Sequence, residues 1–149
     1  MIWKAISLWE PYGSAIACGA KRNETRSWAT AYRGPLLICT AKRRFEQELT
    51  WILTSGDWQK ALAPLAPDGR VKPYHLSFGC AVATCDLVDC VPSEEANPSD
   101  WEVLFGDYTP GRFAWRLDNV VRLAVPLPVA GRQGFFNVGL SADLTAVLQ

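Results

Sequence analysis

Apolar and polar residues alternate along much of the chain in the pattern of β-strands. The stretches with this pattern, or with a β-rich composition, are 2–8, 21–28, 36–40, 76–91, 112–117 and 133–138. The stretch 76–91 is apolar on both faces, which predicts a central strand of a sheet. Strands with a few interspersed helices and no regular βαβ rhythm predict an α+β fold, with a small barrel as the favoured architecture.

Short helices are predicted between these strands. Pro11 suits the first turn of a helix, where its missing N–H costs nothing, and Gly19 provides a stop. Apolar residues with helical spacing predict a second helix over 45–53 that ends at Gly56. Further helices are expected over 99–106 and 140–148.

Local signals predict where several elements begin and end. Ser99 and Glu102 have the spacing of a capping box, in which each side chain accepts from the other residue's backbone amide. Pro126 and Pro128 are expected to break the strand that begins near residue 112. The segment 57–73 contains three prolines and is predicted to be a loop or insertion with little regular structure.

Length and composition predict a globular protein that forms one domain over residues 1–149. The chain is 49% hydrophobic and 20% charged, which is typical of globular rather than disordered proteins. No apolar run approaches the ~20 residues needed to span a bilayer, and the first residues are too quickly polar for a secretory signal. We therefore expect a cytoplasmic protein without membrane contact, and no obligate protein partner is evident.

The cysteines favour neither disulfides nor a metal site. Their number is odd, and Cys80, Cys85 and Cys90 follow a C-x4-C-x4-C spacing in a predicted strand. Alternation would place Cys85 on the face opposite to the other two, so these residues could not close on one zinc ion. His75 is the only histidine, which leaves a catalytic triad or a multi-histidine site without its parts. We expect buried, unreactive thiols and neither metal nor cofactor.

Charge is distributed unevenly along a chain whose net charge is zero. Residues 1–44 contain eight basic and two acidic side chains, a net charge of +6, so the remainder carries the compensating −6. A basic end on a neutral chain favours a surface that faces a polyanion. The alternative is a solvated face that the acidic half balances in space.

The densest group of chemically useful residues follows the first predicted helix. Gly19 ends that helix, so Lys21 lies at a corner from which its side chain can reach a cleft. Glu24, Arg26 and Trp28 have the same parity and would share one face of a strand. A carboxylate, a guanidinium and an indole together provide an acceptor, a forked donor and a stacking plane. The alternative is a surface ion pair worth ~0–1 kcal/mol.

Gly19, Lys21, Glu24 and Arg26 form the pattern G-x-K-x-x-E-x-R, which resembles the signature of ASCH domains. That signature also lies directly after the first helix in the family. Other segments that resemble the family are 7–12, 33–38, 42–43, 107–115 and 131–134. The resemblance covers most of the chain, and the flanking matches make coincidence an unsatisfactory explanation.

The resemblance implies a PUA-like small β-barrel with peripheral helices and a cleft beside the first helix. It implies that RNA, or a modified nucleoside or nucleotide, binds there, with Lys21, Glu24 and Arg26 lining the cleft. The other candidate ligand-binding residues are the aromatic Trp9, Tyr12 and Trp28 and, for phosphate, Lys42 and Arg43. Base stacking is worth ~1–3 kcal/mol, comparable with one bidentate contact, so two such anchors could hold a single nucleotide.

The resemblance also implies a hydrolase as the alternative, with Lys21 and Glu24 as the catalytic residues. One branch of the family resembles an amidohydrolase for N4-acylated cytidine, and another member is described as a ribonuclease. That branch uses a lysine, a threonine and a distal glutamate. Here Glu24 stands at the threonine position, with Thr25 next to it, and Glu94 and Glu95 are the candidates for the distal glutamate.

The lysine–glutamate pairing favours binding over catalysis, because a lysine paired with a carboxylate stays charged and is a poor nucleophile. A third alternative is an adaptor that binds a partner through exposed aromatic residues. Its complexes would be insensitive to salt, whereas phosphate contacts weaken steeply as salt rises.

Overall fold

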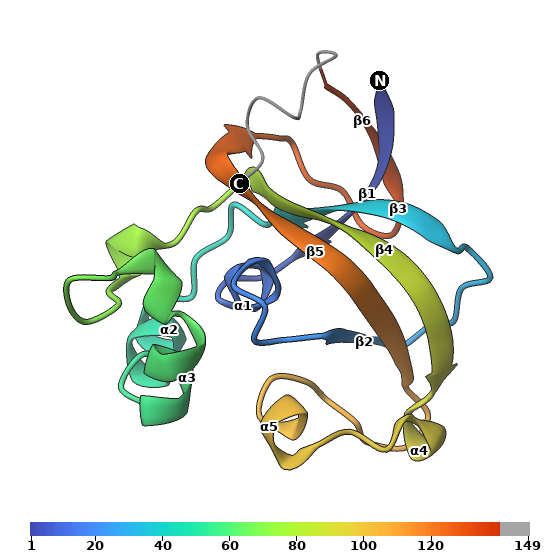
Figure 1. Ribbon diagram of the computed structural model, residues 1–149, viewed down its shortest axis with the longest axis horizontal. Helices are drawn as coiled ribbons and strands as arrows, with labels where there is room; N and C mark the ends of the chain where they lie inside the picture. The colour runs from blue at the N-terminus through green and yellow to red at the C-terminus, as the bar shows by residue number, and fades with distance from the viewer. Residues whose placement is uncertain (141–149) are drawn as a thin grey trace.

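The computed structural model of the protein describes residues 1–140, which form an α+β fold built on one six-stranded mixed sheet (Figure 1). The strands are β1 (Ile2–Leu8), β2 (Asn23–Arg26), β3 (Gly34–Thr40), β4 (Cys80–Pro92), β5 (Phe113–Pro128) and β6 (Phe136–Gly139). The α+β class predicted from the sequence is confirmed. The strand predicted over 133–138 is shorter and begins at Phe136.

The strand order of the sheet is β2-β5-β4-β3-β1-β6. β1 runs parallel to β3, and the other neighbours are antiparallel. β4 lies in the interior, as predicted for 76–91, although it begins only at Cys80. Within residues 1–140 no hydrogen-bonded pairing joins the outer strands β2 and β6, so the closed barrel is not confirmed.

The helices cover one side and one end of this sheet (Figure 1). They are α1 (Tyr12–Ala17), α2 (Glu46–Ile52), α3 (Gly56–Ala61), α4 (Ser93–Ala96) and α5 (Asp100–Val103), with the 3-10 turns η1 (Ala63–Leu65) and η2 (Pro73–His75). α1 packs against β3, β4 and β5. Pro11 is the N-cap residue of α1 rather than its first helical residue, so the helix begins one residue later than predicted, whereas Gly19, with φ +80°, follows the helix end as predicted.

The two faces of β3 explain why its sequence is continuously apolar. Leu36 and Ile38 pack in one cluster with Trp115, whereas Leu37 packs in a second cluster on the opposite face with Phe136. An interior strand with both faces covered needs apolar residues at every position.

The prediction of a loop over 57–73 is wrong, because this segment contains α3 and η1 and packs into a core between the helices. Trp58 and Leu62 are buried in that core. The Gln59 side-chain amide donates to the carbonyls of Leu53 and Val71, which holds the segment against the end of α2. A helix of six residues is too short to show a periodic pattern, and the prolines only limit its extent.

β5 continues through Pro126 and Pro128, which the sequence predicted to break it. β2 pairs with residues 113–116 of β5, so within residues 1–140 the far half of β5 has a neighbouring strand on one side alone. Proline has no backbone N–H to donate, and it is tolerated where no neighbouring strand needs that hydrogen bond. The predicted helix over 99–106 is shorter than expected, since α5 ends at Val103, and the predicted helix over 140–148 lies almost wholly outside the described residues.

Cys80, Cys85 and Cys90 do not alternate between faces as predicted, because all three contact the same apolar cluster. β4 has an extra residue between Ala81 and Ala83 relative to β3, and another between Leu87 and Asp89 relative to β5, and each changes the parity of the positions that follow. All five cysteines are free; burial raises the pKa of the Cys39 and Cys85 thiols to about 12. The prediction of buried thiols holds for these two, while the others are half-buried.

None of the helices within residues 1–140 combines the length and the apolar character needed to cross a membrane.

Candidate functional site

The turn after α1 directs Lys21 into the protein. The backbone amides of Ala20 and Lys21 both donate to the carbonyl of Ala15, which closes the helix end around Gly19. The Lys21 side chain is only 1% exposed. Its Nζ donates to the carbonyl oxygen of Phe105 at 2.5 Å, so the ammonium group joins the α1–β2 turn to the connection between β4 and β5.

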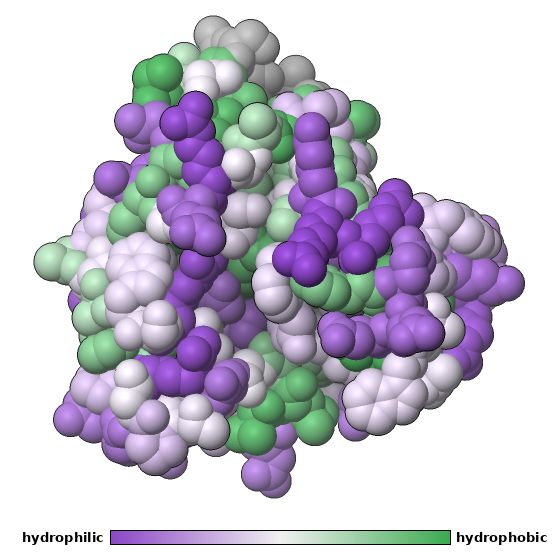
Figure 2. All heavy atoms as spheres, turned by 180° about the vertical axis from the view of Figure 1, so that it is seen from behind, coloured by the Kyte–Doolittle hydropathy of each residue, from purple (hydrophilic) through white to green (hydrophobic). Residues whose placement is uncertain are grey.

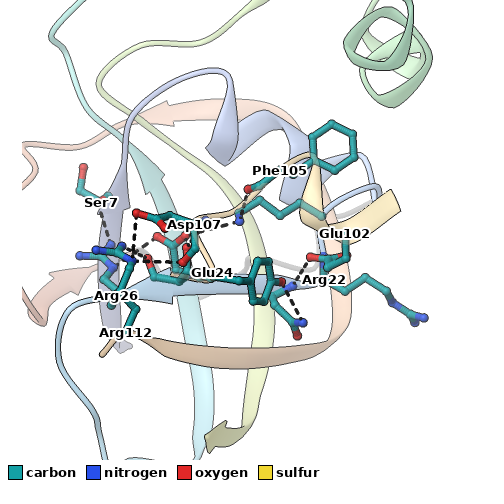
Figure 3. Close-up of polar contacts among 12 residues, drawn as sticks. Ser7, Arg22, Glu24, Arg26, Glu102, Phe105, Asp107 and Arg112 are labelled. Carbon is teal, nitrogen blue, oxygen red and sulfur yellow. Dashed lines mark hydrogen bonds and ion pairs between the residues drawn. The ribbon is translucent and has the colours of Figure 1, made fainter. Parts of the chain in front are cut away.

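Glu24 lies within ion-pair distance of both Lys21 and Arg26 and brings the three charged groups together; Figure 3 shows Glu24 beside Arg26. Its Oε1 is 3.7 Å from Lys21 Nζ, and its Oε2 is 3.3 Å from Arg26 Nε. Arg26 also donates from Nη2 to the carbonyl oxygen of Ser7 at 3.0 Å. Its buried Nε makes no hydrogen bond to any described residue, because the nearby Glu24 oxygen is within ion-pair distance but poorly aligned.

Burial lowers the pKa of Lys21 below its ordinary value of 10.5. The carboxylates of Glu24 and Glu102 act in the opposite direction, and the nearby guanidinium of Arg26 adds to the lowering. The sequence argument gave the pairing with Glu24 more weight than burial and the neighbouring cations. In the folded protein the desolvation of the ammonium group is the larger effect.

These residues line a cleft of about 560 Å³, which we call the signature cleft. The candidate residues that line it are Trp9, Tyr12, Lys21, Glu24, Arg26 and Trp28. Trp9 is 55% exposed and presents its ring to the cleft rim. Trp28 packs edge-on against Trp115, with ring centroids 4.6 Å apart, so its ring is largely committed to the core. Seen from behind the view of Figure 1, the surface is hollowed, and hydrophilic side chains gather along the hollow (Figure 2).

Lys42 and Arg43 do not line the signature cleft. They line an adjoining hollow of about 750 Å³, which we call the basic hollow. The two spaces share Ser7, Trp9, Arg26 and Trp28. The residues that line the basic hollow alone are Ala41, Lys42, Arg43, Ala130, Gly131, Arg132, Gln133 and Gly134. The sequence assigned all candidate residues to one cleft, whereas the structure divides them between two connected spaces.

Sequence reasoning missed the contribution of the β4–β5 connection to the signature cleft. Asp107 and Arg112 line the cleft from this connection. The Thr25 hydroxyl oxygen accepts from the Asp107 amide at 3.0 Å, and Arg112 Nη2 donates to the Thr25 carbonyl at 3.1 Å. Strand parity placed Thr25 away from Glu24 and Arg26, and only the resemblance of 107–115 to the family pointed to this segment.

Glu102 holds the turn that carries Lys21, a role that differs from the predicted capping box. The Ser99 hydroxyl accepts from the Glu102 amide, as that motif requires. The Glu102 carboxylate instead accepts from the backbone amides of Arg22 and Asn23, at 2.9 and 2.8 Å (Figure 3). These two amides lie at the end of the turn after α1 and the start of β2, and the buried Glu102 carboxylate satisfies both.

Replacing Glu102 with alanine should therefore lower the free energy of unfolding by about 2 kcal/mol, because hydrogen bonds to a charged acceptor are lost and two donors stay unpaired. Urea denaturation monitored by tryptophan fluorescence measures this loss. Glu95→Ala removes an exposed glutamate from the same connection and should change the free energy of unfolding little. Equal effects of the two substitutions would contradict the positioning role of Glu102.

Comparison with known proteins agrees with the sequence resemblance. Residues 6–126 match the family model described as the ASCH domain. Activating signal cointegrator 1 of Homo sapiens is 28% identical to this chain over 127 residues, and its counterpart in Mus musculus is 27% identical over the same length. Both alignments cover 85% of this chain but only 20% of the relative, so the chain spans about a fifth of the length of these relatives.

Proposed function

The chain belongs to the ASCH domain family, part of the PUA-like superfamily, and from this premise we propose that it is an RNA- or nucleotide-binding module. The ligand lies in the signature cleft. The observation that carries this proposal is the convergence of the Lys21, Glu24 and Arg26 side chains on one concave surface.

The cleft has the groups needed to recognise a base. Glu24 offers carboxylate oxygens to exocyclic amino groups, and Arg26 offers guanidinium donors to ring nitrogens and carbonyl oxygens. Trp9 provides an exposed aromatic face against which a base can stack. The Lys21 ammonium faces the carbonyl oxygen of Phe105, so it acts mainly by holding Glu24 in place and by adding positive potential.

A hydrolase of the same family is the second candidate, favoured by the lowered pKa of Lys21. Thr25 lines the same cleft and supplies a hydroxyl group close to the signature residues. Against a nucleophilic role, Lys21 is almost fully buried and its Nζ is occupied by Phe105 and Glu24. Binding therefore accounts for more of the geometry than catalysis does.

Arg26→Ala is expected to weaken binding of single-stranded RNA by about 1–3 kcal/mol, because one bidentate donor to the base is lost. Lys21→Met keeps the buried volume while removing the charge, and it should also weaken binding. Fluorescence anisotropy with labelled RNA measures both. Arg116→Ala removes an exposed guanidinium that lies in neither space and serves as the matched control.

Unchanged RNA affinity in both Arg26→Ala and Lys21→Met would reject the proposed function. Incubation with N4-acetylcytidine distinguishes the hydrolase from the binding module. Release of acetate by the wild-type protein, and its loss in Lys21→Met, would establish a hydrolase in place of a binding module.

A further inference from the structure

The signature cleft and the basic hollow lie next to each other, since Ser7, Trp9, Arg26 and Trp28 line both, and we call the two together the groove. We propose that this groove binds a single-stranded RNA of two or more nucleotides rather than a free nucleoside. One base occupies the signature cleft, and the phosphates of the adjoining nucleotides lie in the basic hollow. The inference rests on the proposed function and specifies the ligand of the same site.

The volumes of the two spaces favour a ligand larger than one nucleoside. They measure about 560 and 750 Å³. Sites for a single small molecule occupy roughly 300–1,000 Å³, so each space is large enough for a ligand fragment of its own. A nucleoside in the signature cleft would leave the basic hollow empty.

The charges of the two spaces differ in a way that separates base from phosphate. The signature cleft has charges of both signs, since the carboxylates of Glu24 and Asp107 lie beside the cations Lys21, Arg26 and Arg112. Among the described residues, the basic hollow is lined by no carboxylate and by four cations: Arg26, Lys42, Arg43 and Arg132. An uncharged base fits the first environment and a polyanionic backbone fits the second.

Two of the cations of the basic hollow are available to a ligand. Lys42 and Arg132 are exposed, and neither belongs to an ion pair within the part of the chain that the structure describes. The aliphatic stem of Lys42 lies directly over Gly79, where an added Cβ would come within 2.6 Å of Lys42 Cγ. Glycine at this position lets the stem follow the backbone, which limits the range of positions of the ammonium group.

Trp9 marks the boundary between base and phosphate sites. Its ring packs against Phe45, with centroids 4.7 Å apart, and the Arg43 guanidinium covers Phe45 at 4.7 Å from its ring. The packing against Phe45 restricts the Trp9 indole, so little conformational entropy is lost when it stacks on a base. In an RNA with one base bound in the signature cleft, the backbone passes this ring on its way to the phosphate sites in the basic hollow.

The test compares a nucleoside, a dinucleotide and an octanucleotide of mixed RNA sequence by calorimetry and fluorescence anisotropy. Wild-type protein should bind the octanucleotide at least about tenfold more tightly than the nucleoside. The variant Lys42→Gln with Arg132→Gln should abolish this gain and leave nucleoside affinity unchanged. The slope of log affinity against log salt should fall by ~0.7 for each phosphate contact removed.

Lys72→Gln combined with Arg116→Gln removes two exposed cations outside both spaces and should behave like the wild type. Equal affinity for nucleoside and octanucleotide, or an octanucleotide affinity unaffected by Lys42→Gln with Arg132→Gln, would overturn this inference while leaving the proposed function in place. Failure of every RNA probe to bind would reject the proposed function, and this inference with it.

Discussion

Replacement of Glu24 by alanine is expected to lower the free energy of unfolding by about 3–5 kcal/mol, because it leaves a buried ammonium group without its counter-ion. Lys21 is 1% exposed, and Glu24, three residues further along the chain, lies within ion-pair distance of its ammonium group. An ion pair at the protein surface would contribute only ~0–1 kcal/mol. The size of the loss therefore distinguishes the buried arrangement from the surface pair that the sequence left open.

Urea denaturation of Glu24→Ala and of the double variant Lys21→Met with Glu24→Leu tests the physical cause. Removing both charges leaves no uncompensated ion, so the double variant should recover most of the stability. It should not recover RNA binding, because the recognition groups are gone. Glu95→Ala again serves as the exposed control. A loss as small as that of the control would show that Lys21 is solvated or neutral in the folded protein.

Glu10 is expected to make the stability of the protein depend on pH. Burial raises the pKa of Glu10 from 4.5 to about 7, although hydrogen bonds from Ser14 and Ser77 act in the opposite direction. The native state thus holds the proton more tightly than the unfolded chain does. The contribution of Glu10 is fully present below pH 4.5 and is lost as the pH rises through 7. The loss amounts to about 3 kcal/mol.

Glu10→Gln removes this titration and keeps an oxygen that can accept from the Ser14 amide, which is 2.8 Å from the carboxylate. The variant should gain stability relative to the wild type as the pH rises from 4.5 through 7. Urea denaturation over a series of pH values measures the difference, with Glu95→Gln as the control for a solvated glutamate. Parallel pH profiles of wild type and Glu10→Gln would refute the assignment.

Local sequence patterns predicted much of the signature cleft. Gly19 indicated the corner that turns Lys21 inward, whereas strand parity selected Glu24, Arg26 and Trp28 although Thr25 and Ser27 line the same cleft. These properties depend on neighbouring residues and on the two-residue period of a strand. They are visible in a sequence without knowledge of distant contacts.

Features that depend on distant segments could not be predicted in this way. The burial of Lys21 requires Phe105, and the turn after it requires Glu102, both far along the chain. The division of the basic residues between two spaces depends on the loop that carries Arg132. Register shifts in β4 defeated the parity argument for the cysteines, since a bulge leaves no signal in an apolar sequence.

The β4–β5 connection lies against the α1–β2 turn through Glu102, Phe105 and Asp107 (Figure 3). One wall of the signature cleft therefore comes from a connection between two strands, and the exposed residues of such connections tolerate changes better than strands do. Divergence in residues 93–112 offers a route to new ligand preferences in which the G-x-K-x-x-E-x-R residues themselves stay unaltered.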